Sequence, residues 1–314
     1  MTEPRSYYGR PVIKEPVWKW EIPAYLFTGG LSGASSVLSV SARLFGNDRL
    51  ARTSLYIAAV ADLVSPALLI ADLGRPERFH HMLRVVKVRS PMNVGAWILA
   101  ASGGSTSSAA LLERLGRLRP LRRLAELGAA LSGPPLATYT GVLLADTAIP
   151  VWHGARSELP WVFGASAAAS AGAAACIFVE PSLAGPARRL AIGGVAAEGA
   201  FTQAMERRLG EVGEVYRQQA AGALSLAAKA LAASGAGLLA TRGRSSRRAA
   251  ALGGALVCTG ELCLRFAVFK AGFQSARDPK YTVKPQRERA DRHGTRVSRR
   301  ASRREVRRAD LRSP

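Results

Sequence analysis

Four ionisable residues lie inside long apolar stretches of this 314-residue sequence. They are Asp62, Glu198, Lys229 and Glu261. At the centre of a lipid bilayer such a residue costs about 2.5–3.5 kcal/mol on insertion scales, so its presence indicates a specific role. Two interpretations are open. Either Lys229 forms an internal ion pair with Glu198 or Glu261, or the four residues make up a path for protons or ions.

A second set of polar residues falls near the ends of the apolar stretches, on the side where both termini are expected. It comprises Glu21, Asp72, Tyr139, Asp146 and His153. Carboxyl, phenol and imidazole groups donate hydrogen bonds to the two carbonyls of a quinone headgroup and supply protons during its reduction. Ordinary polar residues at a membrane interface show the same pattern, so these residues alone leave both interpretations open.

The four histidines all fall outside the apolar stretches. They are His80, His81, His153 and His293. Membrane proteins that hold haem for electron transfer use His pairs on facing helices. The sequence therefore predicts no haem, and a redox role requires a diffusible carrier in the membrane and a cofactor on another chain.

The amino-acid composition restricts the classes of protein to which this chain can belong. The sequence holds 44 Lys and Arg against 22 Asp and Glu, a net charge of +22, while 48% of its residues are hydrophobic. Such basicity is typical of proteins that bind nucleic acid or an anionic membrane surface. The three cysteines form no Cys-x-x-Cys pair and no even set, so we expect no disulfide scaffold, zinc ribbon or iron–sulfur cluster on this chain. No metal site is predicted.

Long helices must position these residues. Four windows of about 20 residues, the length that spans a bilayer core, lack any Asp, Glu, Lys or Arg. Soluble helices instead present a charged face at 3.6-residue spacing. Four further windows are similar but contain inner charges. The sequence therefore predicts an all-α, polytopic membrane protein with eight transmembrane helices. Their predicted ranges are 22–44, 52–72, 90–112, 126–146, 159–180, 188–206, 218–241 and 247–270.

The predicted organisation has three parts. Residues 1–21 form an N-terminal arm at the membrane interface, which is too polar for a cleaved signal peptide. Residues 22–273 form the transmembrane domain, and residues 274–314 a basic, disordered tail. Eight spans place both termini on one side. The loops on both sides are about equally basic, and the tail favours the cytoplasm for both termini.

The tail carries fourteen Lys or Arg against five Asp or Glu. Pairs of arginines recur at a spacing of four, so a helix would align them in one stripe. An anionic leaflet attracts such a stripe by about 1 kcal/mol for each basic residue. No aromatic residues interleave the charges as single-strand binders require. We therefore expect the tail to contact the membrane surface or a partner, and no nucleic acid.

Three segments of the chain resemble the NrfD-like, polysulfide-reductase-type family of integral membrane subunits. The most specific is the loop Asp72–Phe79 (DLGRPERF), followed by Lys87–Trp97 (KVRSPMNVGAW). The others are Tyr7–Lys14 (YYGRPVIK) and Arg277–Val283 (RDPKYTV). The similarity extends from the N-terminal arm to about Arg289.

This resemblance implies eight helices in two four-helix bundles and a haem-free, quinone-reactive membrane anchor. The anchor is not catalytic alone. It would pass electrons between menaquinone or ubiquinone and a four-cluster ferredoxin-like iron–sulfur subunit, which connects to a molybdopterin catalytic subunit. The resemblance also implies that the chain is integral to the bacterial cytoplasmic membrane.

The family's quinone pocket lies at the partner-facing end of the first bundle. A polar residue at the start of the first helix, an acid at the end of the second and a Tyr in the fourth line it. By position these become Glu21, Asp72 and Tyr139. We add Asp146 and His153 as proton donors because of their depth.

Two arginines follow Asp72 in the same loop. The turn at Gly74 and Pro76 is expected to place Arg75 and Arg78 at the membrane face beside this carboxylate. A cation there would stabilise a quinone anion and lower the pKa of Asp72. The alternative role for these arginines is the binding of lipid headgroups or of a partner.

A secondary transporter is the alternative function, with Asp62, Glu198, Lys229 and Glu261 as its coupling site. Transporters of this kind are built from inverted repeats with broken helices in matched positions. Pro66 and the pair Pro134-Pro135 are expected to break the second and fourth helices, but the sixth and eighth contain no matching breaks. This asymmetry favours the quinone-reactive subunit.

Overall fold

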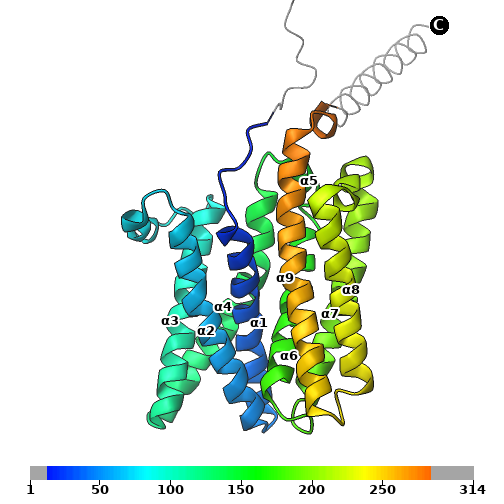
Figure 1. The fold of residues 1–314 in the computed structure, drawn as a ribbon. Helices are drawn as coiled ribbons and strands as arrows, with labels where there is room; N and C mark the ends of the chain where they lie inside the picture. Colours follow the sequence, from blue (N-terminus) through cyan, green and yellow to red (C-terminus); the bar gives the residue numbers. More distant parts are fainter. Residues whose placement is uncertain (1–12, 284–314) are drawn as a thin grey trace, which may run out of the picture.

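The computed structural model describes residues 13–283, and the regular secondary structure in this part of the chain consists of helices only, without strands (Figure 1). The predicted all-α fold is therefore confirmed for these residues. Eight long helices are joined by short loops, one short α-helix and two 3₁₀ helices. In chain order the elements are α1 (Glu21–Leu44), α2 (Asp48–Asp72), η1 (Pro76–Leu83), α3 (Pro91–Leu115), α4 (Arg119–Ala145), α5 (Pro150–Gly154), α6 (Leu159–Phe178), α7 (Gly185–Leu209), η2 (Gly210–Arg217), α8 (Gln219–Thr241) and α9 (Arg247–Arg277).

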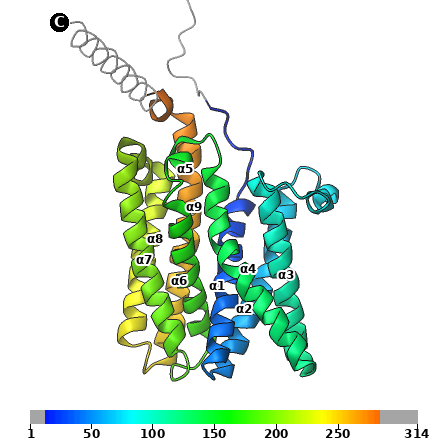
Figure 2. The same cartoon turned by 180° about the vertical axis from the view of Figure 1, so that it is seen from behind.

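The long helices pack side by side in two groups (Figures 1 and 2). Helices α1, α2, α3 and α4 form the first group, and α6, α7, α8 and α9 form the second. Helices α1 and α4 join the groups through contacts with α6, and α1 also contacts α9. The end at which α1 begins and α9 ends is called the upper end here, as drawn in Figure 1.

Each predicted membrane-spanning range coincides with one of the eight long helices, but the last helix is longer than predicted. Helix α9 ends at Arg277 rather than at 270, so it extends past the predicted start of the tail at 274. The physical reason is packing, because Ser275 and Ala276 are buried and Gly272 lies directly against the Trp152 ring. The N-terminal part of the family resemblance, Tyr7–Val12, and the tail beyond residue 283 lie outside the described residues.

The internal prolines were expected to break their helices, but they do not. Helix α2 continues through Pro66, and α4 continues through Pro134 and Pro135. Neighbouring helices and hydroxyl groups satisfy the backbone groups around an internal proline, which is why such helices persist within a membrane.

Four of the long helices are long and apolar enough to cross a membrane by themselves: α2, α6, α8 and α9. The remaining long helices carry charges near their ends. In α3 and α4 these charges are Glu113, Arg122 and Glu126, which meet at the lower end of the first group.

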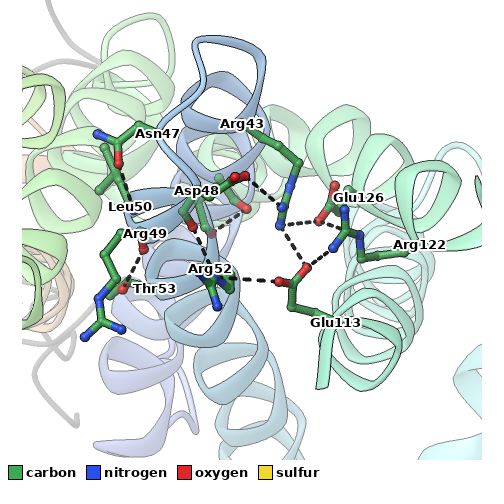
Figure 3. Close-up of polar contacts among 12 residues, drawn as sticks. Arg43, Asn47, Asp48, Arg49, Leu50, Arg52, Thr53, Glu113, Arg122 and Glu126 are labelled. Carbon is green, nitrogen blue, oxygen red and sulfur yellow. Dashed lines mark hydrogen bonds and ion pairs between the residues drawn. The ribbon is translucent and has the colours of Figure 1, made fainter. Parts of the chain in front are cut away.

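That lower end is closed by a cluster of ion pairs (Figure 3). Arg43 of α1 lies between Glu126 of α4, at 2.8 Å, and Glu113 of α3, at 3.1 Å. Arg122 also pairs with both carboxylates, and Arg52 of α2 approaches Glu113 at 3.8 Å. Charges from all four helices thus hold the first group together at this end.

Candidate functional site

A cavity of about 550 Å³ lies within the first group of helices, between α2 and α3, and extends from the upper end towards the middle of both helices. Most of its wall is apolar, with Trp18, Leu69 and Leu99 among the lining side chains. The polar lining residues include Tyr25, Asp62, Asp72 and Tyr139. The structure therefore brings two of the predicted quinone-binding residues, Asp72 and Tyr139, into one cavity.

Tyr139 is held in this cavity by a glycine on the facing helix. A Cβ atom on Gly95 of α3 would lie 1.8 Å from Cζ of Tyr139, so the ring of Tyr139 packs directly on the α3 backbone. The Tyr139 side chain is only 8% exposed. Gly95 belongs to the segment Lys87–Trp97 that carries the family resemblance. The contact with Tyr139 explains why a residue without a side chain is needed at this position.

Asp62 lies deeper in the same cavity. Its side chain is 2% exposed, and its Oδ2 atom accepts hydrogen bonds from Thr106 at 2.7 Å and from Ser102 at 3.0 Å. The other carboxylate oxygen, Oδ1, has no hydrogen-bond partner within residues 13–283. Sequence reasoning assigned Asp62 to a proton path and did not predict that it shares a cavity with Tyr139.

Tyr25 was missed by the sequence analysis. Its side chain is fully buried, lines the cavity, and lies within electrostatic reach of both Tyr139 and Asp62. It follows Glu21 by one helical turn, so the spacing of four between two residues with polar groups on α1 was the available signal. Two phenols and one carboxylate thus converge on the inner wall of the cavity.

Asp72 marks the upper end of the cavity. Its Oδ1 atom accepts a hydrogen bond from the backbone N–H of Lys19 at 3.0 Å. This contact fixes the N-terminal arm across the top of α2. The neighbouring Trp18 lines the cavity and stacks on Trp152 at a centroid distance of 5.9 Å. The arm therefore covers the upper end of the cavity.

Arg75 and Arg78 do not take the expected position beside Asp72. Both side chains are exposed, and neither forms an ion pair with Asp72 in the part of the chain that the structure describes. The reason is that the 3₁₀ helix η1 and its flanking loop project sideways from the upper end, at the left of Figure 1. The arginines are exposed at this end, where a headgroup or a partner surface remains accessible to them.

The loop that contains η1 is fastened to α3 by Asn93. The Asn93 Oδ1 atom accepts a hydrogen bond from the Lys87 N–H, and its Nδ2 atom donates to the Met82 carbonyl, both at 2.6 Å. Through this anchor Phe79 and Met82 reach the cavity wall. Asn93 belongs to the same segment of the resemblance as Gly95, and it positions the loop rather than a ligand.

The remaining predicted pocket residues lie outside the cavity wall. Glu21 is the half-buried first residue of α1, and the adjacent Ile22 lines the cavity in its place. Asp146 is exposed at the C-terminus of α4. His153 is exposed in α5, with Nδ1 at 3.2 Å from the Ala145 carbonyl. The structure thus brings Asp72 and Tyr139 together but not these three residues.

A second cavity, of about 460 Å³, lies between α7 and α8. Glu198, Glu206 and Lys229 line it. The first of the two open interpretations, an ion pair of Lys229 with Glu198 or Glu261, is wrong, because the Lys229 Nζ atom lies 2.7 Å from Glu206 instead. The long, flexible lysine stem carries its charge towards the upper end of the helices, as lysines in membrane helices commonly do.

Glu261 and Arg265 occupy neighbouring turns in the middle of α9. Both are fully buried. The Arg265 guanidinium stacks on the Phe163 ring, 3.7 Å from its centroid, and donates to the Phe163 carbonyl at 2.9 Å. Helix α9 continues for about three turns beyond Arg265. Asp62 belongs to the other cavity, so the four residues of the predicted proton path are not gathered in one place.

The fold and the site define an all-helical integral membrane protein with a buried, largely apolar cavity that contains a few polar groups. The family model described as polysulfide reductase (NrfD_2) matches residues 4–277, and the chain belongs to this family. The resemblance drawn from the sequence is therefore confirmed. Membership indicates a membrane subunit of a reductase complex. No match was found among curated proteins.

Proposed function

We propose that this chain is the quinone-reactive membrane anchor of a respiratory oxidoreductase in the bacterial cytoplasmic membrane. All eight long helices would cross the bilayer as two four-helix bundles. The chain would exchange electrons, without haem, between menaquinone or ubiquinone in the first bundle and a ferredoxin-like iron–sulfur subunit. That subunit would dock at the upper end and connect to a molybdopterin catalytic subunit.

The observation that carries this proposal is the convergence of Tyr25, Asp62, Asp72 and Tyr139 on one otherwise apolar cavity. A quinone, when bound, supplies carrier chemistry for two electrons and two protons. Its ring needs apolar surroundings, and its two carbonyl oxygens need hydrogen-bond donors. The phenol hydroxyls of Tyr25 and Tyr139 are donors of this kind.

The carboxyl groups of the same cavity would exchange protons with the bound quinone. The hydroxyls of Ser102 and Thr106 both donate to Oδ2 of Asp62, which orients the carboxyl group, and Oδ1 is buried. Oδ1 of Asp62 would therefore hold or release a proton beside the ligand. Asp72, which is bound to the arm, would stand between the cavity and the aqueous phase at the upper end.

The arrangement of charges favours this function over a secondary transporter. A coupling site would require Asp62, Glu198, Lys229 and Glu261 to act together. Asp62 instead lies in the cavity of the first group, and Lys229 pairs with Glu206 beside the second cavity. Glu198 and Glu261 remain candidates for a separate proton path through the second group.

Quinone binding to the purified chain in lipid nanodiscs tests the proposal. Trp18 lines the cavity, so quenching of intrinsic Trp fluorescence by menaquinone and ubiquinone analogues reports occupancy. Replacing one hydrogen-bonding group removes about 0.5–1.5 kcal/mol, so Tyr139→Phe and Asp72→Asn are each expected to weaken binding about 2- to 12-fold.

Two matched substitutions outside the cavity serve as controls. Tyr56→Phe changes an exposed tyrosine of α2, and Asp48→Asn changes an exposed carboxylate at the lower end. Neither is expected to alter binding. If the wild-type chain binds no analogue, either alone or in the complex co-purified with its partners, the proposed function is refuted.

A further inference from the structure

We infer that the ligand of the first cavity carries a long apolar tail and reaches the site sideways from the bilayer, between α2 and α3, over Gly103 and Gly104. This inference rests on the proposed quinone function and specifies the ligand class and its route. The tail chemistry that fits is a polyisoprenoid chain, because the route leads from the polar inner wall into the hydrocarbon of the membrane.

The first argument is the length of the cavity. It reaches from Asp72 at the upper end of α2 to Asp62, ten residues away, a rise of about 15 Å along a helix. On α3 it extends from Met92 to Ser107, about 22 Å. A quinone ring occupies only a small part of this length. The remainder, largely apolar, suits a chain attached to the ring.

The second argument is the side on which the cavity opens. The arm and Trp18 cover its upper end, where Lys19 is hydrogen-bonded to Asp72. Leu63 of α2 lines the cavity and is nevertheless 67% exposed. Gly104 of α3 also lines it and is exposed. The wall is thus incomplete on the outer side of α2 and α3, which in a membrane protein faces lipid.

The third argument is what the glycines of α3 do. Small residues in membrane helices usually allow two helices to touch, and Gly33 and Gly133 do so here. A Cβ atom on Gly33 would lie 2.3 Å from the Gly133 carbonyl oxygen. A Cβ atom on Gly103 or Gly104, in contrast, would meet no atom within 4 Å among the described residues. These two glycines leave space open and join no helices.

A buried carboxylate at the same level indicates that this space receives a ligand. Ser102 and Thr106, which flank the two glycines on α3, are the residues that bind Asp62. Asp62, which lines the cavity and is buried, therefore lies at the depth of the opening. Gly103 is also in the middle of the 25-residue helix α3, and hence near the midplane of a bilayer that α3 spans. Polyisoprenoid chains accumulate at that depth.

The experiment compares one headgroup with and without a tail. Menadione has no tail, and the menaquinones used carry two or four isoprenoid units. Binding to the full-length chain in nanodiscs is followed by Trp fluorescence for the wild type, Gly103→Leu and Gly104→Leu. Gly237→Leu in α8 is the matched control, because Gly237 is exposed and a Cβ atom there also meets no described atom within 4 Å.

Gly103→Leu and Gly104→Leu are expected to weaken binding of the tailed quinones about tenfold, since a side chain in an occupied path must displace the tail or the helix. Menadione should bind within about twofold of the wild type, because the same change leaves the inner wall intact. Gly237→Leu should change neither. Thermal unfolding of each variant shows that it has folded, and Gly104→Ala provides a milder substitution if a leucine variant does not fold.

Equal binding of the tailed quinones by the wild type and by folded Gly103→Leu and Gly104→Leu overturns the inferred route. In that case the proposed quinone function stands as long as menadione still binds and Tyr139→Phe weakens it. If the wild type binds neither menadione nor the tailed quinones, either alone or in the complex co-purified with its partners, both the route and the proposed function are wrong.

Discussion

Gly95 of α3 and Tyr139 of α4 are in direct contact, and a methyl group on Gly95 would lie 1.8 Å from Cζ and 2.0 Å from the hydroxyl oxygen of Tyr139. The phenol is therefore clamped between its own helix and the backbone of α3. A side chain held in this way keeps its hydroxyl at a defined place in the cavity and loses little freedom when a ligand binds. The contact joins helix packing to the chemistry of the site.

Gly95→Ala is expected to displace the Tyr139 ring. An added methyl group in a well-packed contact costs about 1–3 kcal/mol, and here the strain falls on a side chain that binds the ligand. We expect a lower unfolding midpoint and weaker quinone binding, measured by thermal unfolding and by Trp fluorescence.

Gly237→Ala in α8, outside the cavity, is the control, because its methyl group enters open space. Gly95→Ala should also cost little when Tyr139 is replaced by Ser, since the ring that it displaces is then absent. If Gly95→Ala is equally costly in both backgrounds, its effect does not pass through Tyr139.

Asp62→Asn is expected to separate binding from turnover. The amide fills the same space, so quinone affinity should stay within a few-fold of the wild type, whereas the side chain no longer carries an exchangeable carboxyl proton. General acid–base groups contribute about 10²- to 10⁴-fold to rate, and a loss in that range is expected in quinone-dependent turnover of the complex co-purified with its partners. Unchanged turnover would assign the proton exchange to another residue.

Arg43→Ala should destabilise the first group of helices strongly. It leaves Glu113 and Glu126 close together with only Arg122 between them, and breaking a buried ion pair costs about 3–5 kcal/mol. Thermal unfolding in nanodiscs measures the effect. Arg52→Ala is the control, because Arg52 is 51% exposed and its contact with Glu113 is 3.8 Å long, so about 1 kcal/mol or less is expected. Equal effects would show that the ion-pair cluster does not stabilise this end.

The position of the N-terminal arm should depend on pH through Glu15. Hydrogen bonds from Arg277, at 2.8 and 3.0 Å, lower the pKa of Glu15 below its ordinary value. A carboxyl group whose pKa is lowered in the docked arm stabilises docking fully above its ordinary pKa. That contribution is lost as the pH falls through the lowered value.

The stacking of Trp18 on Trp152 reports this change, and near-ultraviolet circular dichroism between neutral and acidic pH measures it. The effect should be small, about 1 kcal/mol or less, because the Arg277 side chain is 63% exposed. Glu15→Gln should remove the part of the pH dependence that comes from this ion pair. Glu214→Gln, which removes the separate pair with Lys280, should leave it in place.

The positions of the long helices can be predicted from the sequence alone. Apolar runs of about 20 residues predicted eight ranges, and each coincides with a long helix. The sequence also located the family motif and two residues of the cavity, Asp72 and Tyr139. These predictions depend on local composition and on a short loop motif, and both can be identified without knowledge of the three-dimensional fold.

Which polar residues share a cavity depends on how the helices pack, and this could not be predicted from the sequence. The helices are rich in Ala and Gly and have no continuous charged face, so the sequence does not define the rotation of each helix about its axis. That rotation brings Tyr25 and Asp62 to the same wall as Tyr139 and leaves Glu21, Asp146 and His153 outside it. The sequence also does not define the direction in which a long side chain extends. The pairing of Lys229 with Glu206, and not with Glu198 or Glu261, was therefore not predicted. Close contacts between glycines, such as Gly33 with Gly133, set the spacing of the helices, and such contacts depend on partners far apart in the chain.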